Sequence, residues 1–237
     1  MNPTSNTSPS PHPYQTYGRR RSRGWGEGQT TRMIEDLPKY TVLPQQCLQH
    51  ADVAPFFQES VTEYWLEIGF GQGEHLVTFA KNQPHRGIIG AEVYQSGVVV
   101  ALEKTLQHRV DNVRFYSGDA RQLLDAFPEH SFHGVILLFP DPWPKARHEK
   151  RRLFNDTFVS HLRRLLKPNG VFRFASDALL YAEKVQNTLV NAPGFTLTHR
   201  WESPQRPDAL EWPLTRYEQK ALAKGTSCTY LEFIHTP

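Results

Sequence analysis

Residues 132–139 read Phe-His-Gly-Val-Ile-Leu-Leu-Phe, a run that is apolar on both faces of a strand except at His133. A strand of this kind is typical of the centre of a parallel sheet, where helices cover both faces. The run ends at Pro140-Asp141-Pro142, so a carboxylate follows the buried segment directly. The segment therefore predicts an α/β fold with a polar group at one edge of its sheet.

The rest of the chain alternates between strand-like and helix-like segments from about residue 63 onward. The expected strands are 64–68, 87–93, 113–117, 132–139, 171–175, 195–200 and 229–234. The expected helices are 74–81, 96–108, 121–126, 154–166 and 179–189, with a short one at 28–36 that Pro38 ends. This alternation predicts a doubly wound, mostly parallel, seven-stranded sheet whose ligands bind beyond the carboxyl ends of the strands.

The length of 237 residues fits one large α/β domain. Residues 1–18 are rich in Pro, Ser, Thr and Asn, and we expect them to be disordered. Residues 19–62 form a basic segment with a short helix, and its basic cluster is Arg19, Arg20, Arg21 and Arg23. The main domain is then 63–237.

Composition excludes several classes of protein. Cys47 and Cys228 have no neighbouring thiol, so they indicate free thiols in a reducing cytoplasm rather than a disulfide framework or a zinc site. The eleven histidines lack metal-ligand spacing, and we expect no metal. No segment approaches the roughly 18 apolar residues of a membrane helix, and no signal peptide is evident.

A glycine-rich loop follows the first expected strand of the main domain. Gly69, Gly71 and Gly73 lie between a strand and a helix, where they permit sharp turns and close approach of a ligand. Glu74 stands where a dinucleotide-binding loop has its third glycine. Glu67, close to the strand end, would repel a pyrophosphate but suits a cationic ligand such as S-adenosylmethionine. The loop therefore disfavours a dinucleotide dehydrogenase.

Two more acids lie at the ends of the next two expected strands. Glu92 is placed to accept hydrogen bonds from ribose hydroxyls, and Asp119, followed by Ala120, to accept one from an adenine amino group. Each acid alone is also explained as a helix N-cap or a surface charge. Three acids at successive strand ends together predict S-adenosylmethionine as cofactor.

Asp141 and the residues after it predict a site for a base attached to phosphates. Pro140 and Pro142 fix the backbone around Asp141, whose carboxylate can pair with the N1–H and exocyclic amine of guanine and favour the cation that N7 methylation creates. Trp143 either stacks on a base or packs in the core.

A basic run follows this site. Its five cations are Lys145, Arg147, Lys150, Arg151 and Arg152. The formal net charge is only +3, so this clustering, rather than the overall balance, indicates nucleic acid. If each cation neutralises one phosphate, log K falls with log salt with a slope of about −3.5 to −4.5. The alternative is an ordinary solvated face.

These segments resemble the bacterial tRNA (guanine-N7)-methyltransferase family. The resemblance rests on 66–73, 139–152, 174–177 and 215–218, and extends from about 17 to 235. It implies the class I methyltransferase fold, S-adenosylmethionine as cofactor, and methylation of guanine N7 at position 46 in the tRNA variable loop. It also implies a cytoplasmic enzyme that acts on tRNA as a monomer or homodimer without an obligatory protein partner.

The resemblance also assigns residues to roles. Asp141 is the catalytic candidate. The implied cofactor contacts are Glu67, Gly69, Gly71, Gly73, Glu92, Asp119, Ala120 and Asp141. The implied substrate contacts are Lys145, Asp177, Thr215, Arg216, Tyr217 and Glu218, and the implied RNA contacts are Arg147, His148, Lys150, Arg151 and Arg152. The residues alone would make Glu218 a helix-surface carboxylate.

Two other functions are less well supported by the sequence. Methylation of an exocyclic amine in RNA or DNA is disfavoured because those enzymes mostly carry Asn where this chain has Asp141. A non-catalytic RNA-binding subunit is disfavoured because it would not need all three cofactor acids.

Overall fold

The computed structural model describes Tyr14 and residues 26–237, except for the side chain of Ala146. The predicted disorder of 1–18 therefore lies outside the described residues, apart from Tyr14, and so does the basic cluster at 19–23. The Tyr14 hydroxyl donates a hydrogen bond to Asp125 (2.6 Å).

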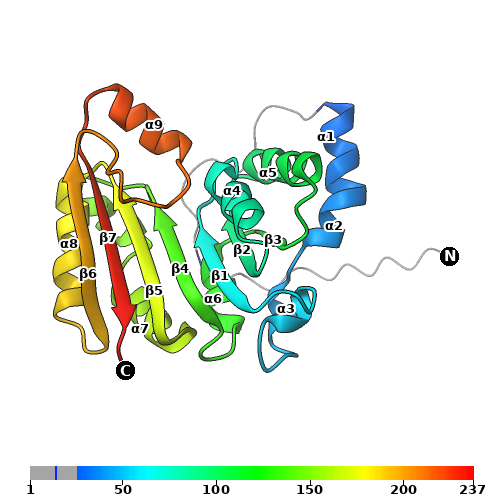
Figure 1. Cartoon of the computed structure of the whole chain (residues 1–237), viewed down its shortest axis with the longest axis horizontal. Coiled ribbons are helices and arrows are strands. Elements are labelled where there is room, and N and C mark those ends of the chain that lie inside the picture. The colour runs from blue at the N-terminus through cyan, green and yellow to red at the C-terminus, as the bar shows by residue number, and fades with distance from the viewer. Residues whose placement is uncertain (1–13, 15–25) are drawn as a thin grey trace.

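Seven strands form one sheet in the order β3-β2-β1-β4-β5-β7-β6 (Figure 1). Strands β1 to β5 are parallel to one another, whereas β7 runs antiparallel to both β5 and β6. The predicted fold class is confirmed. The strands are β1 (Glu63–Ile68), β2 (Arg86–Glu92), β3 (Val113–Ser117), β4 (Phe132–Leu138), β5 (Leu166–Ser176), β6 (Phe195–Ser203) and β7 (Cys228–His235).

Helices cover both faces of this sheet, as the apolar run of β4 requires. One layer contributes apolar residues of α2 (Leu37–Tyr40), α4 (Glu74–Asn82), α5 (Gln95–His108) and α9 (Arg216–Ala223) to a single core cluster. The opposite cluster draws on α3 (Pro44–Cys47), α6 (Ala120–Ala126), α7 (Asp156–Leu165) and α8 (Leu179–Val190). The remaining helical segments are α1 (Glu27–Thr31), a π-helical turn (Arg32–Asp36) and 3-10 helices at Ala54–Phe56 and Ala146–Arg151.

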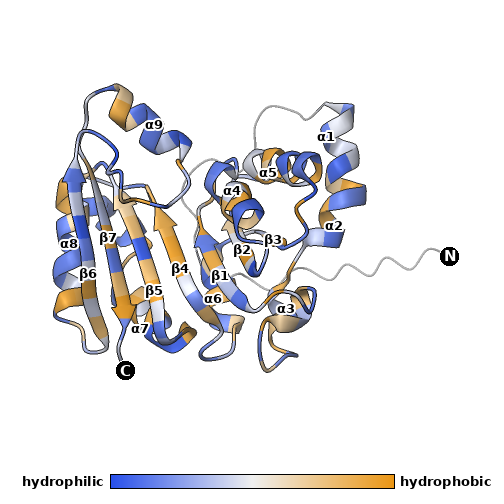
Figure 2. Ribbon diagram, viewed as in Figure 1, coloured by the Kyte–Doolittle hydropathy of each residue, from blue (hydrophilic) through white to orange (hydrophobic). Residues whose placement is uncertain are grey.

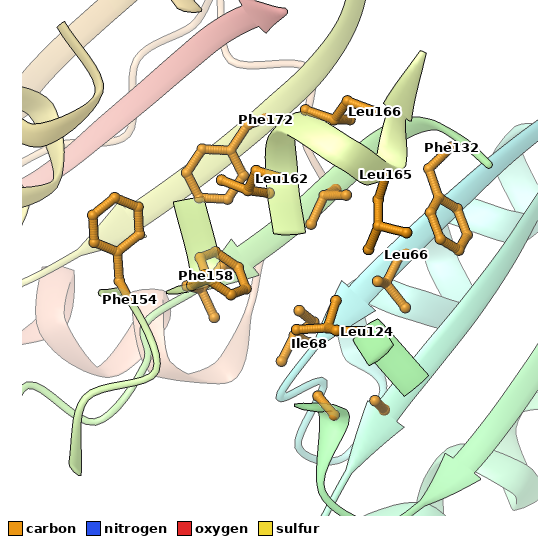
Figure 3. Packing of buried hydrophobic residues seen from close by; sticks show 14 of the residues in the cluster. Leu66, Ile68, Leu124, Phe132, Phe154, Phe158, Leu162, Leu165, Leu166 and Phe172 are labelled. Carbon is orange, nitrogen blue, oxygen red and sulfur yellow. The ribbon is translucent and has the colours of Figure 1, made fainter. Parts of the chain in front are cut away.

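Alternate residues of β4 enter the two cores. Phe132 and Val135 pack with the α6–α8 layer, and Ile136 and Leu138 with the α4–α5 layer. Figure 2 shows the central strands as the most apolar part of the sheet. Figure 3 shows Phe172 of β5 close to residues of α7 in the first of these cores. The prediction of a central strand buried on both faces is confirmed.

Two predicted helix ends are wrong. Pro38 does not stop the first helix, because it lies in the first turn of α2, where its missing N–H is not needed. The helix predicted over 154–166 begins at Asp156 and ends at Leu165, and Leu166 instead pairs with Phe132 in the sheet. Leu165 and Leu166 are both fully buried, so hydrophobic spacing alone does not separate the last helical residue from the first strand residue.

Two kinds of feature, a membrane-spanning helix and a cluster of metal ligands, are absent from the described residues. None of their helices combines the length and the apolar character needed to cross a membrane. They also contain no group of three or more His, Cys, Asp and Glu side chains arranged to hold a metal ion.

Candidate active site

A cavity of about 510 Å³ lies where β1, β2, β3 and β4 end, at the edge of the sheet predicted to bind ligands. Figure 1 shows α9 beyond this edge. The lining residues include Gly69, Gly71, Glu92, Tyr94, Asp119, Ala120, Arg121, Pro140, Asp141, Trp143, Arg151, Arg152, Asn155 and Tyr217. Six of the eight predicted cofactor residues therefore share one cavity; Glu67 and Gly73 are not among its lining residues.

The glycine loop adopts a backbone that favours glycine at each of its three positions. Gly69, Gly71 and Gly73 have φ angles of +74°, +59° and +75°. A Cβ on Gly73 would also meet the Cβ of Ala101 in α5 at 2.5 Å, so this glycine serves helix packing rather than the cavity. A Cβ on Gly97 would lie 2.1 Å from the carbonyl oxygen of Gly71, so α5 presses directly on the loop.

Two side chains fasten this loop. The Glu92 carboxylate accepts hydrogen bonds from the backbone N–H of Gly71 (2.8 Å) and of Tyr94 (2.9 Å). Lys104 of α5 donates to the carbonyl oxygen of Gln72 (2.8 Å) and pairs with Glu74 (2.9 Å). The loop is therefore held in shape by the protein itself.

The three predicted cofactor acids all have protein partners. Glu67 is 3% exposed and its carboxylate lies 2.8 Å from Nδ1 of His75, which is equally buried. Asp119 caps α6 by accepting from the N–H of Arg121, and its carboxylate pairs with the Arg121 guanidinium (2.6 Å). Burial raises the pKa of Glu92, and the charge of Asp141 adds to this shift. The N-cap explanation considered for Asp119 is thus present together with its place in the cavity.

Asp141 differs from these acids. It is exposed toward solvent and lines the cavity. No hydrogen bond or ion pair with another described residue engages its carboxylate, which leaves both oxygens available to a ligand. Burial raises the pKa of Tyr217, and the charges of Glu92 and Asp141 raise it further. Three carboxylates, of Glu92, Asp119 and Asp141, and three guanidinium groups, of Arg121, Arg151 and Arg152, thus line the same cavity.

Trp143 lies at the cavity and not in the core. It is partly exposed and has φ +40°. The Arg151 guanidinium lies over its indole at 4.9 Å from the ring centroid, and the His148 ring meets its edge at 5.7 Å. The core alternative for this residue is therefore wrong.

The basic run divides into two groups. Lys145, Arg147 and Lys150 are exposed around the 3-10 helix. Arg151 and Arg152 instead line the cavity. Three cations are thus directed to solvent, fewer than the five assumed from the sequence.

The predicted substrate contacts lie at different depths. Asp177 is exposed just after β5. Of the segment at 215–218, Tyr217 reaches the cavity, and Arg216 donates to the side-chain oxygen of Gln72 in the glycine loop (2.8 Å). Helix α9, which lies near the C-terminus of the sequence, therefore contacts the glycine loop.

Glu218 does not lie on the helix surface, as the residues alone would suggest. It is 2% exposed and forms a capping box with Thr215, which is also buried. Its carboxylate pairs with Arg206 and accepts from the Tyr230 hydroxyl (2.8 Å). Its role in this structure is to fix the start of α9.

Several lining residues were not predicted. Tyr94 and Arg121 follow Glu92 and Asp119 by two residues each, so their place after strand ends is a signal that the sequence does contain. Asn155 caps α7 by accepting from the N–H of Phe158 (3.0 Å), which only the structure connects to the cavity. A second hollow of about 560 Å³ lies between α7 and α8, and none of its lining residues was predicted to bind a ligand.

Solved structures with this fold include two rRNA methyltransferases. The 16S rRNA methyltransferase KamB superposes with a TM-score of 0.56 at 13% identity, over 76% of this chain and 95% of that one. An rRNA methylase from Streptococcus thermophilus gives 0.51 at 10% identity, over 82% and 94%. At such identities the likeness shows the class I methyltransferase fold alone.

Sequence comparison is more specific. Residues 61–231 match a family model described as "Putative methyltransferase". A tRNA (guanine-N(7)-)-methyltransferase of Azorhizobium caulinodans is 41% identical over 95% of this chain and 97% of its own length. The enzyme of that name from Ruegeria pomeroyi is 39% identical over 97% and 98%. The chain belongs to the bacterial tRNA (guanine-N7)-methyltransferase family.

Proposed function

We propose that this protein transfers a methyl group from S-adenosylmethionine to N7 of guanine at position 46 in the variable loop of tRNA. The observation that carries the proposal is Asp141, an exposed carboxylate that no other described residue pairs with, lining a cavity built on a glycine loop. The names of its relatives support tRNA and guanine N7 as the target. In this proposal the enzyme acts on tRNA in the cytoplasm.

The cavity suits S-adenosylmethionine in size and charge. Its volume of about 510 Å³ lies within the range of roughly 300–1,000 Å³ typical of small-molecule sites. Glu92 and Asp119 border the ends of β2 and β3, where the ribose and adenine would be held. Glu67 lies below this surface, so we propose that it shapes the loop through His75 rather than touching the cofactor. The cofactor, when bound, supplies an electrophilic methyl group.

Asp141 has two tasks in this proposal. Its carboxylate accepts hydrogen bonds from the N1–H and exocyclic amine of guanine, which orients N7, whose lone pair lies in the ring plane and needs no base to free it. It also stabilises the positive charge that appears on the ring as N7 is methylated. Alignment of the reacting atoms is most of what such a transfer requires of the protein.

The surroundings of Asp141 fit an RNA substrate. Trp143 offers an aromatic face beside the cavity, although Arg151 lies over one side of it. Lys145, Arg147 and Lys150 are placed to meet phosphates. With three such cations the run accounts for a salt slope of about −2 to −3, smaller than the value expected from five. We propose Asp177 and the segment 215–218 as further substrate contacts, with Glu218 acting only through the position of α9.

Radiolabelled S-adenosylmethionine and unmodified tRNA test this function. The protein should label a single nucleoside, N7-methylguanosine, and lose that activity when guanosine 46 becomes adenosine. An Asp141→Asn variant should still bind S-adenosylmethionine and tRNA but turn over at least about 100-fold more slowly. A label in an exocyclic amine would instead support the amine-methylating alternative. Bound but unlabelled tRNA would support an RNA-binding subunit.

A further inference from the structure

We propose that Arg152 is a positioning residue that holds the loop 140–144 in its active shape, and not a phosphate contact. This inference rests on the proposed function, because the loop carries Asp141. It separates Arg152 from the exposed cations that precede it in the same run.

The contacts of Arg152 point inward to the loop backbone. Its Nε donates to the carbonyl oxygen of Pro142 (2.7 Å), and its Nη2 to that of Trp143 (3.3 Å). One planar guanidinium thus bridges two successive carbonyl groups, a geometry that a single ammonium does not reproduce.

The loop needs such an external support. Three of its five residues are Pro140, Pro142 and Pro144, which have no N–H to donate. The backbone is strained just before the loop and near its end, since Phe139 and Trp143 have φ angles of +50° and +40°. A chain segment with few donors and strained ends keeps its shape only when its surroundings hold it.

Other side chains hold the Arg152 guanidinium in place. Its guanidinium lies over the ring of Tyr181, 5.1 Å from the centroid, and Tyr181 is only 1% exposed. Glu149 accepts from Nη1 (3.4 Å) and also pairs with Lys184 of α8. The Arg152 side chain is 15% exposed, whereas Lys150, two residues earlier, is open to solvent. Arg152 therefore links the catalytic loop to α8.

This arrangement has a consequence for Asp141. Because no other described residue bonds to its carboxylate, the direction of that carboxylate depends on the loop backbone. A displacement of about 1 Å at a reacting group lowers turnover by roughly 100-fold. Loss of the Arg152 bridge should therefore affect the chemical step and not RNA affinity.

Steady-state kinetics of Arg152→Lys, Arg152→Gln and the matched control Lys150→Gln test the role. Both Arg152 variants should lower kcat by roughly 10- to 100-fold, with KM for tRNA within about twofold and an unchanged salt slope. The lysine should not rescue, since charge alone cannot bridge two carbonyls. Lys150→Gln should raise KM for tRNA and reduce the salt slope by about 0.7–0.9. Retained tRNA affinity shows that the Arg152 variants are folded.

The opposite pattern overturns the inference. If Arg152→Lys turns over like the wild type, or Arg152→Gln loses salt slope as Lys150→Gln does, then Arg152 is a phosphate contact. Crystal structures of the variants give a readout without activity, and the carbonyl groups of Pro142 and Trp143 should be displaced only in the Arg152 variants. Carbonyl groups that stay in place refute the bridge. A wild type that makes no N7-methylguanosine refutes the proposed function instead, whatever those structures show.

Discussion

The close approach of α5 to the glycine loop makes Gly97→Ala a sharp perturbation. The added Cβ would lie 2.1 Å from the Gly71 carbonyl oxygen, where ordinary contact begins at 3.4 Å. Backbone atoms must therefore separate by roughly 1 Å or more. Overpacking of this kind costs about 1–3 kcal/mol. Replacing glycine by alanine within a helix stabilises it by about 0.5–1 kcal/mol, so the free energy of unfolding should fall by about 0–2.5 kcal/mol.

The larger effect should be on cofactor binding. When Gly71 moves away, its N–H leaves the Glu92 carboxylate, a hydrogen bond to a charged group worth about 1.5–3 kcal/mol. We therefore expect calorimetry to show S-adenosylmethionine bound at least about tenfold more weakly.

Gly28→Ala is the matched control, because Gly28 lies in α1 with nothing within 4 Å of its added Cβ. It should leave binding unchanged and add up to about 1 kcal/mol of stability. If Gly97→Ala binds like Gly28→Ala, the argument that α5 sets the loop position is refuted. A loss of stability with normal binding would refute it too, because α5 and not the loop would then have moved.

Three other substitutions test further contacts. Lys104→Met keeps the aliphatic stem but removes the hydrogen bonds to Gln72 in the glycine loop and to Glu74 at the start of α4. Calorimetry should show S-adenosylmethionine bound roughly five- to tenfold more weakly, and unchanged affinity would contradict this. Glu218→Gln removes the charge that pairs with Arg206 beside the Tyr230 hydroxyl. Urea denaturation should show that the free energy of unfolding falls by about 2 kcal/mol, and no measurable fall would contradict this. Burial lowers the pKa of His133, whose Nδ1 accepts a hydrogen bond from the backbone N–H of Tyr64 (3.0 Å). The contribution of neutral His133 to stability is therefore present above about pH 6.5 and is lost as the pH falls toward the folded-state pKa. His133→Asn keeps an acceptor that does not titrate, so its stability should fall less than that of the wild type below about pH 6.5, and parallel curves would contradict this.

The sheet could be predicted from the sequence because its signals are local. The apolar run at β4 and the alternation of strands with helices depend only on hydrophobic spacing. A carboxylate at the carboxyl end of a parallel strand must lie at that edge of the sheet. The positions of Glu92, Asp119 and Asp141 followed from this reasoning, and the structure brings all three to one cavity.

The missed features depend on contacts between distant segments. Glu67 points to His75 inside the core, and the sequence does not show which way a strand residue faces when both faces are buried. Arg152 reads as one more cation in a basic run, and only the fold shows that it bonds to the loop ten residues earlier. The sequence suggests that Glu218 is a surface acid, because its partners Arg206 and Tyr230 are brought to it only by tertiary packing. In each case the charge was evident, but its partner was not.

The most direct test of the account uses a tRNA carrying 7-deazaguanosine at position 46. This nucleoside keeps the N1–H and the exocyclic amine that Asp141 is proposed to bind, but it has no N7. With labelled S-adenosylmethionine, we predict that the tRNA binds with normal affinity and accepts no methyl group, whereas the guanosine control is fully labelled. Methylation of the 7-deazaguanosine tRNA at position 46, or equal labelling of both, would contradict N7 as the acceptor.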